Sequence, residues 1–361
     1  MSTPSLTLPG IRRTIPAQSW GLLAGITAGL VALAVVGWEA HCRQLGYTAG
    51  LDDTLDLWVE QRRAVQPDDT IIIGASRGLF GLDLDALEQG LGHRPRQLCL
   101  VGSCVYPILK DVADDQSFHG TVICDLVPGL LLVPPMAPPY HNAQNALDRR
   151  RDQSVAQQMS HYLSLPLERT FASLQQEDLT LTALLGTLRI PNRAHAQMGP
   201  PLPPHFSSID EDRRTRMLDR VLSDSALRDR VKYGWAPLFT PPPKPHWIPD
   251  AAFGEYIHGM IEGRFADMAK AVAAIRARGG KVVFIRMPSQ GDLRAVEDGI
   301  TPRTAVWDRL LKDTGAPGIF AEDHPELAGF TLPEWSHLSA ADSVTFTQRL
   351  VPLLKDALTT K

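Results

Sequence analysis

An excess of positive charge is missing from this sequence. Its 361 residues include 36 Lys and Arg against 40 Asp and Glu, which gives a formal net charge of −4. A nucleic-acid-binding protein needs a basic surface to neutralise phosphates, so we expect no nucleic acid among the partners. Internal repeats are absent as well, and the mean hydropathy of −0.10 excludes a polytopic transporter.

Cysteine is scarce, and no metal-binding pattern accompanies it. The four cysteines form no Cys-x-x-Cys pair and match no zinc spacing, and the motif His-Glu-x-x-His does not occur. The sequence therefore predicts neither a metal nor a cofactor. In an oxidising compartment Cys99 and Cys104 are close enough in sequence to pair. Because Cys99 and Cys124 lie within apolar, strand-like runs, small buried thiols are the favoured interpretation.

Long apolar runs are absent except for one near the N-terminus. No charged residue occurs from Thr14 to Trp38, and within this stretch residues 20–38 are almost wholly apolar, with tryptophan at each end. As a helix this run measures about 28 Å, which matches the hydrocarbon core of a bilayer. Arg12 and Arg13 precede it, so the positive-inside rule predicts a single-pass anchor in a bacterial inner membrane, with a cytoplasmic N-terminus and a periplasmic main domain. A cleaved signal peptide and a buried core helix are the alternatives.

Beyond the anchor, short β-branched runs alternate with helical patterns. This alternation predicts an α/β protein with a parallel sheet of about five strands. The expected strands are residues 70–74, 97–101, 121–125, 281–285 and 318–321. The expected helices of the framework are residues 82–91, 265–278 and 340–358.

Proline marks the segment that interrupts this framework. Five clusters of two or three prolines fall between positions 134 and 243, where a residue with no backbone donor breaks regular structure. We expect a proline-rich, mostly helical insert there, with a helix at 207–227, and not an independent domain. The predicted organisation is a cytoplasmic N-terminus (1–19), an anchor (20–38), a juxtamembrane connector (39–69), a first core part (70–130), the insert (131–260) and a second core part (261–361).

One serine stands directly after the first expected strand. The segment Gly74-Ala-Ser76-Arg-Gly78 has the Gly-x-Ser-x-Gly form of a nucleophile elbow, in which a tight turn exposes the serine hydroxyl. Ligands of an open parallel sheet bind at the carboxyl ends of the strands, where Gly102 and Asp125 also lie. The competing interpretation is a plain turn in which Ser76 caps the next helix.

A serine nucleophile needs a base, and the base needs an orienting acid. Glu334 precedes His337 by three residues on a loop before the last helix, so its carboxylate is placed to accept from the imidazole Nδ1–H. His324 is the rival base. Glu255-x-x-His258 has the same spacing but lies at the end of the insert, away from any expected strand end.

A serine after the first strand, a glycine after the second and an acid-x-x-His before the last helix together resemble the SGNH/GDSL hydrolase superfamily. More narrowly, Gly74-Ala-Ser76-Arg77 looks like the Gly-x-Ser-Arg block of membrane-anchored SGNH-like proteins of bacterial envelopes, some of which move acyl groups on or off polysaccharides. The resemblance covers residues 70–128 and 281–358. The α/β-hydrolase fold shares the elbow motif, but only about 30 exported residues precede the first strand, too few for the strands that fold places earlier.

The resemblance implies a three-layer, flavodoxin-like sheet and assigns roles to four residues. Ser76 is the implied nucleophile, His337 the base, and Glu334 takes the place of the usual aspartate. The amides of Ser76 and Gly102 are the implied oxyanion-hole donors. The substrate is then an ester-linked acyl group, acetyl included, of an envelope glycan or lipid; the resemblance does not address oligomeric state.

One position departs from the superfamily. Its third sequence block normally supplies an asparagine as a further oxyanion donor, whereas Asp125 stands at that strand end here, and an ionised carboxylate cannot donate. Either Asn142, Asn145 or a backbone amide substitutes, or catalysis is weakened, since one donor is worth about 10²–10³ in rate. Two hypotheses therefore stand: a serine esterase or O-acyltransferase, and a non-catalytic envelope protein that keeps the fold for binding or assembly.

Two arginines are candidate substrate-binding residues. Arg77 follows the serine, and Arg286 ends the fourth expected strand, so both are expected near the strand ends. A guanidinium there is suited to a carboxylate or phosphate on the substrate. For Arg286 a role in a salt bridge is an equal alternative.

Overall fold

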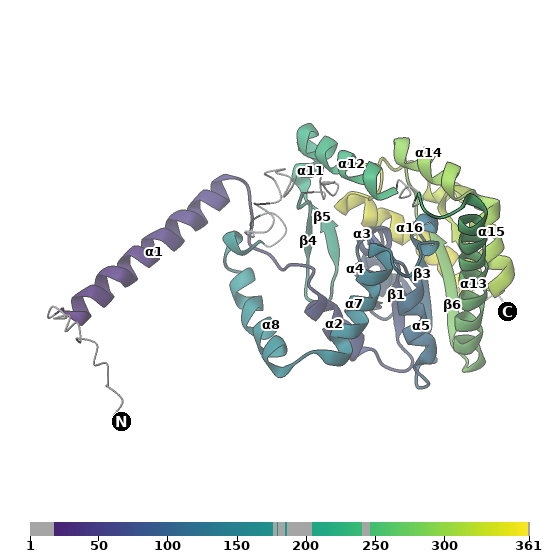
Figure 1. Ribbon diagram of the computed structural model, residues 1–361, viewed down its shortest axis with the longest axis horizontal. Coiled ribbons are helices and arrows are strands. Elements are labelled where there is room, and N and C mark those ends of the chain that lie inside the picture. Colours follow the sequence, from purple (N-terminus) through teal and green to yellow (C-terminus); the bar gives the residue numbers. More distant parts are fainter. Residues whose placement is uncertain (1–17, 176–178, 180–184, 186–203, 240–245, 360–361) are drawn as a thin grey trace, which may run out of the picture. The chain divides into compact units, whose positions relative to one another are not determined.

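The computed structural model describes residues 18–175, 179, 185, 204–239 and 246–359 (Figure 1). The chain divides into two compact units, residues 1–48 and Ala49–Lys361. Helix α1 (Trp20–Gln44) lies in the first unit and extends six residues past the predicted apolar span. Within the described ranges it is the one helix long and apolar enough to cross a membrane, as the sequence predicted.

A five-stranded parallel sheet forms the centre of the second unit and confirms the predicted α/β class. Its order is β2-β1-β3-β6-β7, so β1 and β3 are central. Strand β2 is shorter than predicted, although amide hydrogen bonds from Leu98 and Leu100 to β1 and Gly74 continue the ladder. The strands are β1 (Thr70–Ile73), β2 (Arg96–Gln97), β3 (Thr121–Asp125), β6 (Lys281–Arg286) and β7 (Gly318–Phe320).

Side chains of alternating parity bury both faces of this sheet. On one face Ile71, Val122 and Phe284 belong to a single buried cluster with residues of the surrounding helices. Because both faces are buried, β1, β3 and β6 carry consecutive apolar residues and do not alternate apolar with polar ones. The helices that contribute to this cluster are α2 (Leu55–Ala64), α5 (Tyr106–Asp114), α13 (Asp250–Ala277) and α15 (Arg303–Thr314), with further residues from α6 (Pro128–Leu131) and α7 (Pro138–Asp152).

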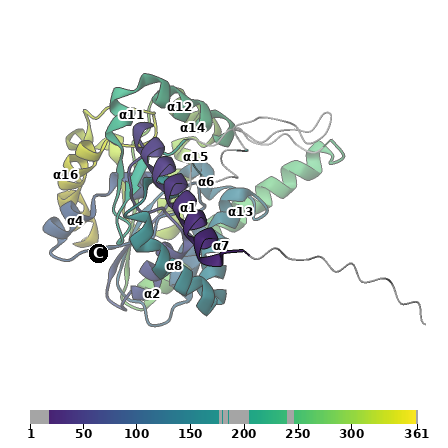
Figure 2. The same ribbon diagram turned by 90° about the vertical axis from the view of Figure 1, so that its left-hand side faces the viewer.

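The opposite face carries a second cluster around Ile72, Ile123 and Ile285. The C-terminal helix α16 (Ala340–Thr359) packs beside α4 (Leu84–Leu91), as both views show (Figures 1 and 2). Helix α4 begins at the side-chain cap of Asp83 and ends at Gly92, whose φ of 83° favours glycine. The short helix α3 (Ser76–Gly81) joins β1 to this layer.

Short elements follow the carboxyl ends of the strands. They bring the loops of the sheet together at one edge, where the predicted site residues lie. These elements are α6 (Pro128–Leu131) after β3, α14 (Gly291–Ile300) after β6, and η2 (Ala321–Asp323) and η3 (Pro325–Leu327) after β7.

The described part of the insert is mostly helical, as predicted, and one segment departs from the prediction. The prediction of a helix at 207–227 is wrong for the first half of that range, which forms a two-stranded antiparallel hairpin. Arg213, between the two strands, adopts a φ of 64°, which a helix does not allow. Phe206, Val221 and Trp235 of the insert belong to the second core cluster, the one around Ile72, Ile123 and Ile285. The described elements are α7 (Pro138–Asp152), α8 (Val155–Glu168), η1 (Ala172–Leu174), β4 (Ser207–Ile209), β5 (Thr215–Met217), α11 (Asp219–Ser223) and α12 (Ser225–Phe239).

Part of the predicted connector belongs to the core. Helix α2 buries Trp58, whose indole Nε1 donates to the carbonyl of Leu98 at 2.9 Å. The predicted helix at 265–278 starts earlier, at Asp250. All four cysteines are buried free thiols, so Cys99 and Cys104 do not pair.

Candidate active site

The turn that carries Ser76 is fitted closely against the end of β3. Strand register pairs Ile73 with Cys124, which brings Gly74 beside Asp125. A Cβ on Gly74 would lie 2.6 Å from the Cβ of Asp125, and one on Gly78 would lie 2.7 Å from the same atom. Gly74 also has a φ of 150°. Both glycines of Gly-x-Ser-x-Gly are therefore required by close approach.

The Asp125 carboxylate binds two backbone amides of this turn. Its Oδ2 accepts from the amides of Gly78 at 2.9 Å and Ala75 at 3.3 Å, while its fully buried Oδ1 has no partner among the described residues. Burial raises the pKa of Asp125 to about 6, against the opposing effects of the Gly78 amide and of nearby Arg77 and Arg286. The residue at the position where the superfamily has an asparagine donor is thus an acceptor that fixes the serine turn.

Ser76 itself is the first residue of α3 and is partly exposed. Asp125 takes the amides on either side, and in the part of the chain that the structure describes the Ser76 amide and hydroxyl have no hydrogen-bond partner. The N-terminal amides of a helix that lack intrahelical acceptors are available to an anion. The Ser76 amide is therefore unoccupied, which an oxyanion donor at this position requires.

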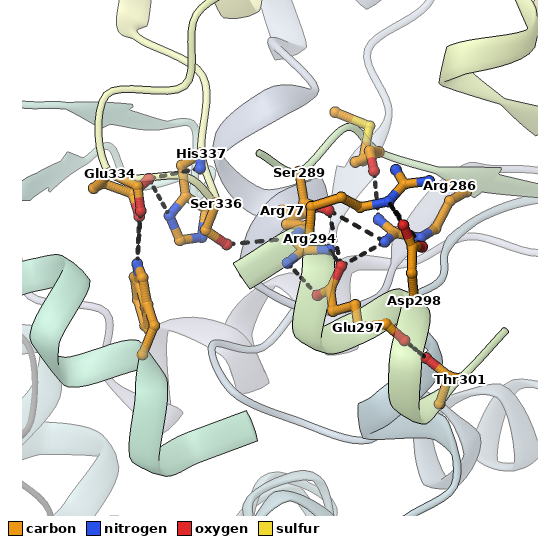
Figure 3. Close-up of polar contacts among 12 residues, drawn as sticks. Arg77, Arg286, Ser289, Arg294, Glu297, Asp298, Thr301, Glu334, Ser336 and His337 are labelled. Atoms are coloured by element: carbon orange, nitrogen blue, oxygen red, sulfur yellow. Dashed lines mark hydrogen bonds and ion pairs between the residues drawn. The ribbon is translucent and has the colours of Figure 1, made fainter. Parts of the chain in front are cut away.

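Glu334 and His337 form a buried hydrogen-bonded pair on the loop before α16 (Figure 3). Glu334 Oε1 lies 2.9 Å from the imidazole Nδ1 and 2.6 Å from the His337 amide, and both side chains are 0% exposed. An ionised carboxylate only accepts, so Nδ1 carries the hydrogen, and in the neutral imidazole Nε2 then carries a lone pair. That Nε2 is buried and has no partner among the described residues. Trp335, between the two, has a φ of 76°, a strained conformation of the kind that often occurs at functional sites.

Three aromatic rings surround the imidazole. The ring centroid of His337 lies 4.5 Å from that of Phe80, 5.5 Å from Trp235 and 5.7 Å from Phe206. Trp235 also donates from Nε1 to Glu334 Oε2 at 2.6 Å. Phe206 and Trp235 come from the insert, so the insert covers the acid–histidine pair; we call these two residues the aromatic cover.

Helix α3 brings Ser76 and His337 to one region. Ser76 and Phe80 are one turn apart on the same helix face, and His337 packs on Phe80. In the same segment, Arg77 Nε donates to Ser336 Oγ at 3.2 Å. No hydrogen bond joins Ser76 to His337 in the described structure, so the nucleophile–base contact of the triad remains a prediction.

The two candidate substrate arginines converge on one buried carboxylate (Figure 3). Arg77 and Arg286 both bind Glu297, with Arg77 Nη2 at 2.5 Å from Oε1 and Arg286 Nη2 at 2.6 Å from Oε2. All three side chains are at most 3% exposed, and Ser289 Oγ adds a bond of 2.8 Å to Oε2. Burial would raise the pKa of Glu297, but the two guanidiniums outweigh it and lower the pKa to about 2. The structure thus gives both arginines a partner within the protein.

The remaining candidates make no hydrogen bond with Ser76 or His337 among the described residues. Gly102 occupies a turn with a φ of 60°, and its carbonyl accepts from the side-chain amide of Asn142 at 3.4 Å, so this candidate substitute donor is already bonded to Gly102. The rival base His324 lies beyond β7 with its Nδ1 3.7 Å from Glu326. Glu255 and His258 are exposed on α13.

The sequence interpretation missed Glu297 and the aromatic cover. A signal for Glu297 was present, since Leu293 and Glu297 share one face of α14 and an acid at core spacing needs a cationic partner. Nothing local to Trp235 or Phe206 indicates His337, because more than 100 residues separate each of them from it. The described residues contain no group of His, Cys, Asp or Glu able to hold a metal ion.

Comparisons with known proteins add no relative. No protein-family model, no curated protein and no solved structure matches the chain.

Proposed function

We propose that this chain is a membrane-anchored serine esterase or O-acyltransferase with an SGNH-like active site. Ser76 is the nucleophile, His337 the base and Glu334 the orienting acid. The observation that carries the proposal is the buried Glu334–His337 pair, whose Nε2 has a free lone pair and whose ring packs against the helix that begins at Ser76. An unpartnered, oriented imidazole nitrogen is costly in a protein interior unless it has a reaction partner.

The proposed fold is the three-layer, flavodoxin-like arrangement. The strand order, counted within the parallel sheet, is 2-1-3-4-5, the order of doubly wound proteins whose ligands bind at the carboxyl ends of the strands. Helix α1 is the proposed anchor in a bacterial inner membrane. Arg12 and Arg13 support a cytoplasmic N-terminus and a periplasmic second unit.

In the proposed reaction Ser76 Oγ attacks the ester carbonyl. His337 Nε2 takes the hydroxyl proton, and Glu334 stabilises the imidazolium through Nδ1. The Ser76 amide donates to the oxyanion. The imidazolium then protonates the departing alcohol, which leaves an acyl group on Ser76. Water or a sugar hydroxyl, deprotonated by His337, accepts that acyl group and restores the serine.

In this proposal Asp125 and the buried arginines fix the position of the serine turn and do not contact the substrate. Asp125 binds the amides that flank Ser76, and Arg77 ties α3 to Ser336 beside the histidine. In the proposed site Arg77 and Arg286 therefore position the turn through Glu297, and the substrate role expected for these arginines requires them to exchange that partner.

A second candidate function is a non-catalytic envelope protein of the same fold. The observation that favours it is the closed site: the His337 side chain has no exposed surface, and no hydrogen bond joins it to Ser76 within the described residues. A substrate reaches Nε2 only if the aromatic cover moves.

Labelling with a fluorophosphonate separates the two functions. The full chain in detergent is treated with the probe, and peptide mass spectrometry locates the adduct, in wild type and in Phe206→Ala, which opens the aromatic cover. We expect a Ser76 adduct that Ser76→Ala abolishes and His337→Gln slows at least 10²-fold. Ser103→Ala and His324→Ala are the matched controls and should label normally. If neither wild type nor Phe206→Ala labels at Ser76, the non-catalytic function replaces the proposal.

A further inference from the structure

Helix α8 of the insert exposes its apolar face. Val155, Met159, Tyr162, Leu163 and Leu167 recur at the spacing of one helical stripe, and their exposed fractions range from 46% to 76%. We call these five residues the α8 stripe. Figure 1 shows α8 at the periphery of the second unit. In a soluble protein such a stripe normally faces the core.

The polar face of α8 points inward and fixes the orientation of the helix. His161 Nε2 lies 3.3 Å from Glu60 Oε2, and Glu168 Oε2 accepts from the Asp52 amide at 3.4 Å. His161 and Glu168 are both at least 93% buried. This side of the helix borders a cavity of about 470 Å³ whose lining includes Asp52 and Asp56. Rotating α8 to hide its stripe would place apolar side chains against these acids.

The helix is also well formed at its start. Ser154 and Gln157 make a reciprocal capping box, with bonds of 3.3 Å and 2.8 Å. Between Val155 and Leu167 the sequence contains no Lys, Arg, Asp or Glu. The outward face can therefore leave water without desolvating a charge, and Tyr162 has the amphipathic ring favoured at the membrane–water interface.

The length of chain between the two units limits how far the second unit can lie from a membrane that α1 spans. From Trp38, the end of the apolar run, to Ala49, the start of the second unit, the helical part and the four residues after it reach at most about 27 Å. A unit of about 310 residues has a radius of gyration of roughly 20 Å. If α1 spans a membrane, the tether is too short to carry the second unit away from the headgroups.

We propose that the α8 stripe docks onto the lipid bilayer in which α1 is anchored, as an interfacial helix. The proposal rests on the membrane anchoring proposed above and not on the chemistry of Ser76. Val155, Met159, Leu163 and Leu167 enter the boundary between headgroups and acyl chains, and Tyr162 lies at its polar edge. The bilayer then sets the orientation of the second unit in addition to tethering it.

Site-specific fluorescence quenching tests this docking. Leu163→Cys and Met159→Cys are labelled with bimane in the full chain, reconstituted in vesicles with and without doxyl-labelled lipid. Lys355→Cys, exposed on α16, is the control position, and the wild-type chain, whose four cysteines are buried, gives the labelling background. We expect doxyl lipid to quench bimane at 163 and 159 several-fold more than at 355.

Equal quenching at all three positions would overturn the proposal. So would a change in bimane emission at 163 that follows protein density and not doxyl lipid, because a second copy would then cover the stripe. Resistance of the chain to alkaline carbonate extraction reports the anchoring of α1 separately. Fluorophosphonate labelling of Ser76 is read on the same samples, so loss of either proposal is distinguishable from loss of the other.

Discussion

Replacing Glu297 with glutamine tests the buried charge cluster behind the serine turn. The carboxylate of Glu297 receives four hydrogen bonds, two from Arg77, one from Arg286 and one from Ser289, at 2.5–3.1 Å. Glu297→Gln keeps the shape of the side chain but removes the charge that both guanidiniums share. Two buried cations are then left without their counterion, which is strongly destabilising.

The pKa of Glu297 gives the size and the pH dependence of the effect. Its folded-state pKa is about 2, below the ordinary value of 4.5. A carboxyl with a lowered pKa stabilises the fold above the unfolded value, and this contribution is lost as the pH falls through the folded value. The shift corresponds to about 3 kcal/mol at pH 7, about a quarter less at pH 4, and less than half at pH 3.

Thermal unfolding of the detergent-solubilised chain measures this loss. With an unfolding entropy of roughly 2.1 cal/mol/K per residue, about 3 kcal/mol lowers the Tm of the second unit by about 5 °C. Glu262→Gln is the matched control. Glu262 also binds one guanidinium through both oxygens, that of Arg309, but the pair lies at the surface, where water screens the charges and the loss is expected to be small. The reasoning is refuted if Glu297→Gln costs no more than Glu262→Gln at pH 7, or if its excess does not shrink in acid.

Two further substitutions test the serine turn and the aromatic cover. Gly78→Ala puts a Cβ 2.7 Å from that of Asp125, so we expect it to lower the Tm by at least 5 °C. The control is Gly263→Ala on α13, whose new Cβ meets nothing within 4 Å and should raise the Tm by about 1 °C. Equal effects of the two substitutions would contradict the close approach of Gly78 to Asp125. Trp235→Phe removes the 2.6 Å bond to Glu334 and should cost about 2–3 kcal/mol more than Trp307→Phe, a buried tryptophan with no such bond among the described residues. Differential scanning fluorimetry of both pairs measures the differences, and equal losses for the two tryptophans would mean that the indole does not support the acid.

The sheet could be predicted because its signal is local. A run such as Thr70–Ile73, β-branched at every position, is explained by burial on both faces of a parallel strand. The residues at 207–227 gave the opposite result, since their charged pattern suits an exposed helix. What makes the hairpin there is Arg213, whose buried guanidinium binds Asp53 and two carbonyls at the end of β2. That partner lies 160 residues away, where no local pattern registers it.

In the candidate site, too, the local contacts could be predicted from the sequence and the distant ones could not. Glu334 and His337 could be paired from sequence because three residues of loop are enough to bring the carboxylate to Nδ1. The environment of that pair depends on the insert, since Trp235 satisfies the second carboxylate oxygen from 99 residues away. Arg77 was assigned to substrate because its position after the serine was visible and its partner, 220 residues on, was not.

In this chain the two glycines of Gly-x-Ser-x-Gly are explained by contact with the end of β3 and not by the serine between them. A motif of two glycines around a serine recurs by chance, but here each glycine lacks a Cβ where Asp125 would meet it within 2.7 Å. Small residues at these positions let the β1 turn lie directly on the end of the neighbouring strand, and the Asp125 carboxylate then takes the Ala75 and Gly78 amides. Because those two amides are occupied, the amides of Ser76 and Arg77 are the donors at the start of α3 that have no partner among the described residues. In the proposed mechanism Asp125 therefore holds the serine turn and leaves the Ser76 amide available to a tetrahedral oxyanion.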